Sequence, residues 1–127
     1  MKKDSLPNSF KKNRLLHDRK ISDESLIEYG ELFFESGRLI DAANFFNKVS
    51  FQEGLDRLKK VAVEQGDSFL FQNVLRSSHE KEVKVEWEAL GNKAMELKKY
   101  SHAIPAFQAA GNEESQKKAE EALKSLS

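Results

Sequence analysis

The sequence contains no cysteine, only two prolines, and no uninterrupted apolar run longer than the three residues of Val61–Val63. The absence of cysteine excludes disulfides, thiolate metal sites and thiol catalysis. Apolar runs this short do not predict a transmembrane helix, which needs about 20 apolar residues. Asp4 and Pro7 stand where a signal peptide would have its apolar core. We therefore expect an unexported, cytoplasmic protein.

Reactive constellations are also missing from the sequence. His17, His79 and His102 lie far apart, and none belongs to the helical pair of histidines that binds zinc. Neither a glycine-rich phosphate loop nor a glycine-flanked nucleophile turn occurs. The sequence therefore predicts no enzyme activity, no cofactor, no metal site and no small-molecule substrate.

The net charge is zero, but the charges are unevenly distributed along the chain. Residues 1–20 carry a net charge of about +5, which leaves about −5 for the remainder. We expect a basic, flexible N-terminal arm over residues 1–21 and a mildly acidic domain over residues 22–127. Within the arm, Phe10 to Lys20 has the length of a short helix that orders against the domain or a partner. The cations of the arm are Lys2, Lys3, Lys11, Lys12, Arg14, Arg19 and Lys20.

Helical periodicity is clearest between Trp87 and Gly111, where two apolar stripes are separated by a break at residues 98–100. Two amphipathic segments joined by so short a turn predict an antiparallel helical hairpin. Gly91 interrupts the first segment, where glycine costs about 1 kcal/mol relative to alanine. It therefore predicts a close approach of the second helix, with the small Ala103 facing the gap. The apolar positions are Trp87, Leu90, Ala94 and Leu97, then Ala103, Ile104, Phe107 and Ala110.

This pattern resembles the tetratricopeptide repeat, a helix-turn-helix unit that is recognised in sequences by a Trp, Leu-Gly, Ala and Phe signature. The resemblance implies hairpins stacked as a short right-handed α-solenoid whose concave side binds other proteins. The residues that carry it are Trp87, Leu90, Gly91, Ala103, Phe107 and Ala110.

The same pattern occurs earlier in the chain, so the sequence contains an internal repeat. Gly30, Ala42 and Phe46 precede the corresponding residues of the later copy by 61 positions. A degenerate copy lies between them, with Lys59 and Phe71 in place of the glycine and alanine, so this hairpin should pack at another distance or angle. We expect an all-α protein with hairpins at about residues 23–50, 52–79 and 84–111, and a capping helix at about 113–126.

Most phenylalanines fall on the predicted apolar stripes, which predicts that they pack in the core. Phe69 of the middle hairpin and Leu123 and Leu126 of the capping helix are included in these stripes. The side chains of Phe34, Phe45 and Phe51 lie beside the stripes, so we expect them to be partly exposed and available for contact.

The resemblance places the first helix of each hairpin along the concave groove. Such a groove would be acidic with apolar patches, suited to an extended or helical segment with Lys or Arg and a few apolar residues. We therefore expect a non-enzymatic adaptor or scaffold, without the cationic clamp that holds a C-terminal carboxylate in some family members. The groove residues are Ile27, Glu28, Glu31, Phe34 and Glu35, then Glu88, Asn92, Met95 and Glu96, with Asp56 and Lys60 less certain.

Two alternatives remain open at this point. The basic arm would anchor the protein to anionic lipid or to nucleic acid, through phosphate contacts that weaken with salt. In the second alternative, the acidic groove would bind the basic arm itself, either within one chain or between the two chains of a homodimer.

Overall fold

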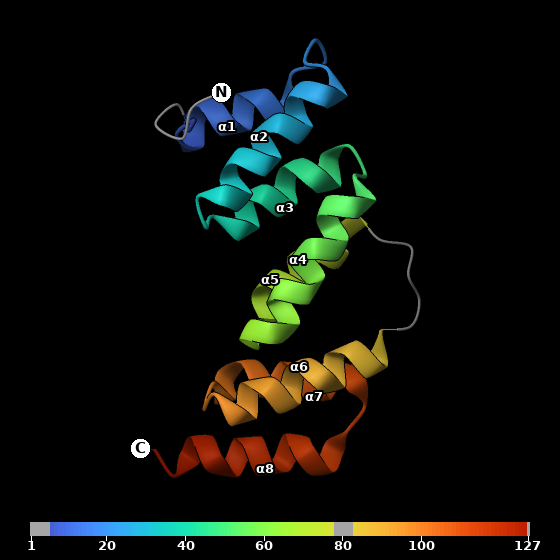
Figure 1. The fold of residues 1–127 in the computed structure, drawn as a ribbon. Helices are drawn as coiled ribbons and strands as arrows, with labels where there is room; N and C mark the ends of the chain where they lie inside the picture. The colour runs from blue at the N-terminus through green and yellow to red at the C-terminus, as the bar shows by residue number, and fades with distance from the viewer. Residues whose placement is uncertain (1–5, 78–82, 127) are drawn as a thin grey trace. The chain divides into compact units, whose positions relative to one another are not determined.

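The computed structural model describes residues 6–77 and 83–126, and in these ranges it is all-helical, as predicted (Figure 1). Two compact units, Met1–Leu58 (unit 1) and Lys59–Ser127 (unit 2), meet within one helix and are described separately. The helices are α1 Ser9–His17, α2 Asp23–Glu35, α3 Leu39–Lys48, α4 Gln52–Gln65, α5 Ser68–Val74, the 3-10 turn η2 Leu75–Ser77, α6 Lys84–Glu96, α7 Tyr100–Ala110 and α8 Glu113–Lys124.

Local chemistry fixes several helix ends where the sequence predicts them. The Ser22 hydroxyl accepts a hydrogen bond from the Ser25 N–H at 3.1 Å, which caps α2. The Asn112 side chain caps α8 in the same way, also at 3.1 Å. Gly37 and Gly111 follow α2 and α7 with φ of 79° and 72°, in the left-handed region where a side chain is strained. The boundaries of these helices are therefore properties of local sequence.

The core of unit 1 is organised around the ring of Phe46 on α3. A Cβ added at Gly30 on α2 would collide with this ring, and a Cβ at Gly54 on α4 would lie 2.7 Å from it. Both glycines are therefore required because an aromatic ring fills the space of their missing side chains. The sequence predicts close approach at Gly30 correctly, but the group that approaches is Phe46 rather than the small residue Ala42.

The prediction that Phe45 is partly exposed is wrong. Phe45 is fully buried, and its ring stacks on Phe33 at 5.4 Å and on Tyr29 at 5.8 Å between centroids. Because Phe45 and Phe46 are adjacent on a helix, their burial covers two sides of α3, so its apolar face is wider than one stripe. Phe34 and Phe51 are half-buried, as expected.

The arm contains a helix, α1, in the stretch where the sequence allows one. Lys12 of α1 forms an ion pair of 2.5 Å with Asp41 of α3, which also binds Arg38 at 2.8 Å. Pro7 is buried, and Leu15 and Leu16 are half-buried. The predicted flexibility of residues 1–21 stays a prediction, and Lys2 and Lys3 lie outside the described residues.

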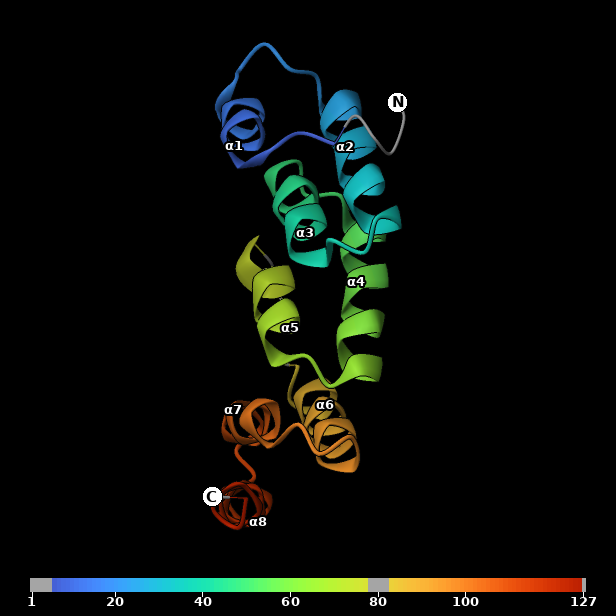
Figure 2. The same ribbon diagram turned by 90° about the vertical axis from the view of Figure 1, so that its left-hand side faces the viewer.

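Unit 2 repeats the packing of glycine against phenylalanine. A Cβ at Gly91 on α6 would lie 2.7 to 2.9 Å from the ring atoms of Phe107 on α7. Beside this ring, Ala94, Ala103 and Ala119 bring α6, α7 and α8 together in one buried cluster. Figure 2 shows α8 beside α7 and α7 beside α6, all nearly end-on. As at Gly30, the group that approaches the glycine is the phenylalanine ring rather than the predicted small residue, and Ala103 is buried beside it.

The turn between α4 and α5 is held against the third hairpin by different contacts. Gly66 has a φ of 60°, and a Cβ there would lie 2.8 Å from the Ala94 backbone, so both conformation and space require glycine. The Lys99 ammonium donates to the last carbonyl of α4, Gln65 O, at 2.8 Å. Ser68 is buried at the start of α5, and its backbone N–H donates a hydrogen bond to His102 Nδ1 at 3.0 Å. The Ser68 hydroxyl oxygen lies 2.9 Å from the same nitrogen. Polar contacts thus supplement apolar packing where the repeat pattern is degenerate.

Four apolar residues assigned to the core stripes are exposed instead. Phe69 is 64% exposed because the buried face of α5 is formed by Leu70, Phe71 and Val74, and its ring lies edge-to-face with the His102 ring at 5.0 Å between centroids. Leu123 and Leu126 are 41% and 70% exposed at the end of α8, where Ala119 alone is buried. Leu97 is also exposed, since α6 ends at the preceding residue.

We predict that Gly91→Ala lowers the free energy of unfolding, although alanine is the better helix former by about 1 kcal/mol. The new methyl group displaces the Phe107 ring, which costs about 1–3 kcal/mol. Chemical denaturation measures the change. Adding Phe107→Leu should recover part of the loss, and a stabilised Gly91→Ala variant would contradict the ring packing.

We also predict that His102→Ala lowers the free energy of unfolding by about 1–3 kcal/mol, because it leaves the buried Ser68 N–H without its acceptor. His17→Ala is the matched control, since His17 is exposed on α1. Thermal and chemical unfolding of both variants tests this. Equal stability of the two variants would show that the Ser68 contact contributes nothing.

Candidate partner-binding surface

Four glutamates form a single ridge along α2. Their spacing of four, three and four residues brings them to one side of the helix, and three are exposed while Glu31 is half-buried. Ile27 and Phe34 are half-buried and lie seven residues apart beside this ridge. Together these six side chains make an acidic surface with an apolar edge, called here the acidic face. Its residues are Glu24, Ile27, Glu28, Glu31, Phe34 and Glu35.

Arg57 of α4 occupies the middle of the acidic face. Its guanidinium pairs with the Glu31 carboxylate and lies 4.9 Å from the centroid of the Phe34 ring. Such a cation–aromatic contact adds about 0.5–1 kcal/mol at exposed sites. Glu31 is therefore already neutralised within the chain, whereas Glu28 and Glu35 stay exposed at either side of it. The sequence gives no sign of this pairing, because Arg57 lies 26 residues beyond Glu31.

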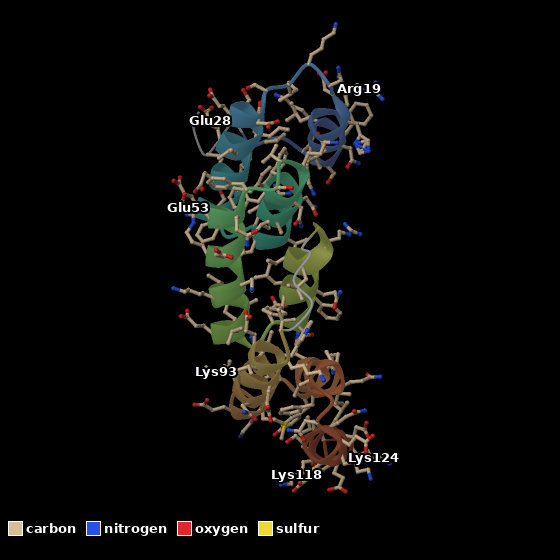
Figure 3. All side chains as sticks on the ribbon, turned by 90° about the vertical axis from the view of Figure 1, so that its right-hand side faces the viewer. Arg19, Glu28, Glu53, Lys93, Lys118 and Lys124 are labelled. Atoms are coloured by element: carbon tan, nitrogen blue, oxygen red, sulfur yellow. The ribbon has the colours of Figure 1, made fainter. Side chains whose placement is uncertain are left out.

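The first part of α4 adds carboxylates near the acidic face. Glu53 and Asp56 are exposed, and Asp56 accepts a hydrogen bond from the Gln52 side chain at 2.7 Å. Figure 3 shows Glu28 and Glu53 projecting from the same side of unit 1, and Arg19 projecting from the other. Glu28 and Glu53 therefore lie on a different side of this unit from Arg19.

The groove residues predicted from the third hairpin all lie on α6, but their environments differ. Glu88 accepts a hydrogen bond from the Asn112 side chain at 2.8 Å, which ties it to the start of α8. Met95 is half-buried against the cluster of Ala94, Ala103, Phe107 and Ala119. Asn92 and Glu96 are exposed, with Glu96 3.6 Å from Lys93. Sequence reasoning missed Val85, which is 82% exposed near the start of α6.

The structure groups the predicted residues into two sets, one on α2 in unit 1 and one on α6 in unit 2. A single groove that joins both sets stays a prediction. The residues predicted to pack the repeats are buried, except for the half-buried Ala110. The buried ones are Gly30, Ala42, Phe46, Trp87, Leu90, Gly91, Ala103 and Phe107.

Unit 1 also contains a pocket of about 250 Å³ where the arm joins α2 and the end of α3. Its lining mixes carboxylates, cations and apolar side chains, so it has no single charge preference. Neither periodicity nor spacing indicates it, because residues from three segments form it. The lining residues are His17, Asp18, Arg19, Ile21, Asp23, Leu26, Lys48 and Val49.

Within residues 6–77 and 83–126, no group of three or more histidine, aspartate or glutamate side chains is arranged to hold a metal ion. No helix in the same ranges is both long enough and apolar enough to cross a membrane. The chemistry offered by the acidic face is ion pairing and apolar contact.

No protein-family model, curated protein or solved structure matches the chain. What the structure shows is an all-helical protein in which neighbouring helices pack as pairs, compatible with a helical repeat. The resemblance to the tetratricopeptide repeat rests on the residue pattern and on the matching glycine and phenylalanine contacts in the two units.

We predict that Arg57→Ala lowers the stability of the protein by about 1 kcal/mol, through loss of the Glu31 pair and the Phe34 contact. The effect is limited because the buried Arg57 Nε has no acceptor among the residues that the structure describes. A double-mutant cycle with Glu31→Gln isolates the coupling between the two charges. Lys118→Ala, which breaks the exposed pair with Glu114, is the control and should have almost no effect. Additive effects of Arg57→Ala and Glu31→Gln would contradict the pairing.

Proposed function

We propose that the chain is a non-enzymatic adaptor whose hairpins stack in the manner of tetratricopeptide repeats and bind a segment of another protein. The first helices of the hairpins, α2 and α6 among them, would line the concave side of this stack. Partner binding would combine ion pairs with a small apolar contact. In such interfaces the ion pairs mainly set selectivity, and the apolar contact mainly sets affinity.

The acidic face of α2 is the observation that carries this proposal. Glu28 and Glu35 are exposed around a half-buried apolar strip formed by Ile27 and Phe34. A structural helix needs a polar outer surface, but it does not need one row of carboxylates beside large apolar side chains. This combination suits a partner with cations flanking an apolar residue.

The spacing along α2 limits the partner sequences that fit. Glu28 and Glu35 are seven residues apart, so their carboxylates are separated by about 10 Å along the helix axis. An extended partner in the polyproline II conformation rises about 3.1 Å per residue with three residues per turn, so two cations three residues apart would lie on one side and match this distance. A helical partner would need them seven residues apart. Because Arg57 already covers Glu31 and Phe34, the partner would contact the two ends of the ridge or displace Arg57.

Short synthetic peptides with two arginines around a leucine, three residues apart for an extended partner or seven for a helical one, test this proposal by fluorescence anisotropy. The same peptides with glutamates in place of the arginines are the comparison. We predict that the basic peptides bind. The double substitution Glu28→Lys with Glu35→Lys should weaken their affinity at least tenfold, because two ion pairs become two repulsions. Both substitutions are at exposed positions, so the fold should survive them.

Glu120→Lys with Glu121→Lys provides the matched control, because these exposed residues of α8 change the net charge equally. An equal loss of binding in this control would indicate a nonspecific charge effect. Equal binding of acidic and basic peptides, or no binding of either set in extended or helical spacing, would reject the acidic face as the binding site.

A further inference from the structure

The structure orients α1 so that one side is held by the domain and the other faces solvent. Lys12 is paired with Asp41, and Leu15 and Leu16 are half-buried on the inner side. The outer side carries Phe10, Arg14 and His17, which are four and three residues apart and therefore lie in one row. The sequence by itself does not show which cations of the arm point outward.

The outer side of α1 and the turn that follows it form a cationic patch with one prominent aromatic ring. The Phe10 side chain is 73% exposed, the largest exposed fraction among the phenylalanines of the described residues. Four cations are exposed on α1 and in the turn after it, and none of them is ion-paired within the described residues, although Asp18 lies among them. This basic patch consists of Phe10, Lys11, Arg14, Arg19 and Lys20.

We infer that the basic patch docks the protein onto an anionic lipid surface, with Phe10 in the interface and the cations among the headgroups. Attraction between basic segments and anionic lipids is short-ranged, and each Lys or Arg near the surface strengthens it. An exposed aromatic ring adds apolar burial at the level of the headgroups. Few cations and a single ring give weak, reversible docking rather than stable insertion.

Phe10 favours a lipid surface over nucleic acid. Proteins that bind single strands stack successive bases on several aromatic side chains, and Phe10 is the sole aromatic residue of the arm. Duplex binding through phosphates would use the cations but would gain nothing from an exposed apolar ring. On a membrane, both kinds of side chain contribute at once.

The position of the basic patch is compatible with simultaneous partner binding. Arg19 projects from one side of unit 1, and Glu28 and Glu53 project from the other (Figure 3). A membrane that attracts the cations would therefore not cover the acidic face. Lipid docking through α1 does not depend on the adaptor role proposed for α2.

The test is co-sedimentation of the full chain with vesicles of phosphatidylcholine alone or with one third phosphatidylserine. We expect binding to the anionic vesicles at about 0.05 M NaCl and release at about 0.5 M, where the screening length falls to roughly 4 Å. Lys11→Gln with Arg14→Gln should reduce the partition coefficient about thirtyfold, about fivefold per cation. Phe10→Ala should reduce it about tenfold.

Matched controls on other helices separate a specific patch from general charge and hydrophobicity. Lys117→Gln with Lys118→Gln removes two exposed cations from α8, and Phe69→Ala removes the exposed ring of α5. Both controls should bind as the original chain does, and circular dichroism checks that every variant retains its helices.

Three results would overturn the inference. One is the absence of binding to anionic vesicles at low salt, and another is an equal loss of binding in the control variants. The third is tighter binding to a labelled oligonucleotide that Phe10→Ala leaves unchanged, which would assign the patch to nucleic acid.

Discussion

The packing of a phenylalanine ring against a helical glycine is the contact on which both units depend. In unit 1 the Phe46 ring fills the space beside Gly30 and Gly54, and in unit 2 the Phe107 ring fills the space beside Gly91. Glycine is a poor helix former, so its cost is offset by the burial of a whole aromatic ring between two backbones. The same solution at equivalent positions is the strongest structural support for an internal repeat.

The turn between α4 and α5 is held by contacts of another kind. Gly66 allows the α4–α5 turn to touch the Ala94 backbone, while His102 accepts the hydrogen bond of the Ser68 N–H. Polar contacts of this kind are directional, so they fix one arrangement where apolar packing alone would permit several. The exposure of Phe69 follows from the same arrangement, since Leu70 and Phe71 face the interior instead.

Folding decides which charged side chains of this protein are paired and which stay exposed. The arm and the domain have opposite net charge in the sequence, but the structure alone decides that Lys12 turns inward to Asp41. Likewise, Glu31 belongs to the predicted acidic ridge, yet Arg57 neutralises it. The exposed negative charge of the acidic face therefore lies on Glu24, Glu28 and Glu35, and the exposed positive charge of the arm lies on the cations that do not turn inward.

The sequence by itself determined the all-α class, the helix ends at Ser22, Gly37 and Gly111, and the repeated glycine and phenylalanine positions, because capping, backbone conformation and periodicity are local. It also placed Glu28, Glu31 and Glu35 in one predicted set, and helical spacing brings these residues to one side of α2. Only the tertiary structure decided that Phe45 is buried, that Phe69 is exposed and that Arg57 covers Glu31. Each of these outcomes depends on which distant helix lies opposite a side chain, and periodicity within one helix does not contain that information.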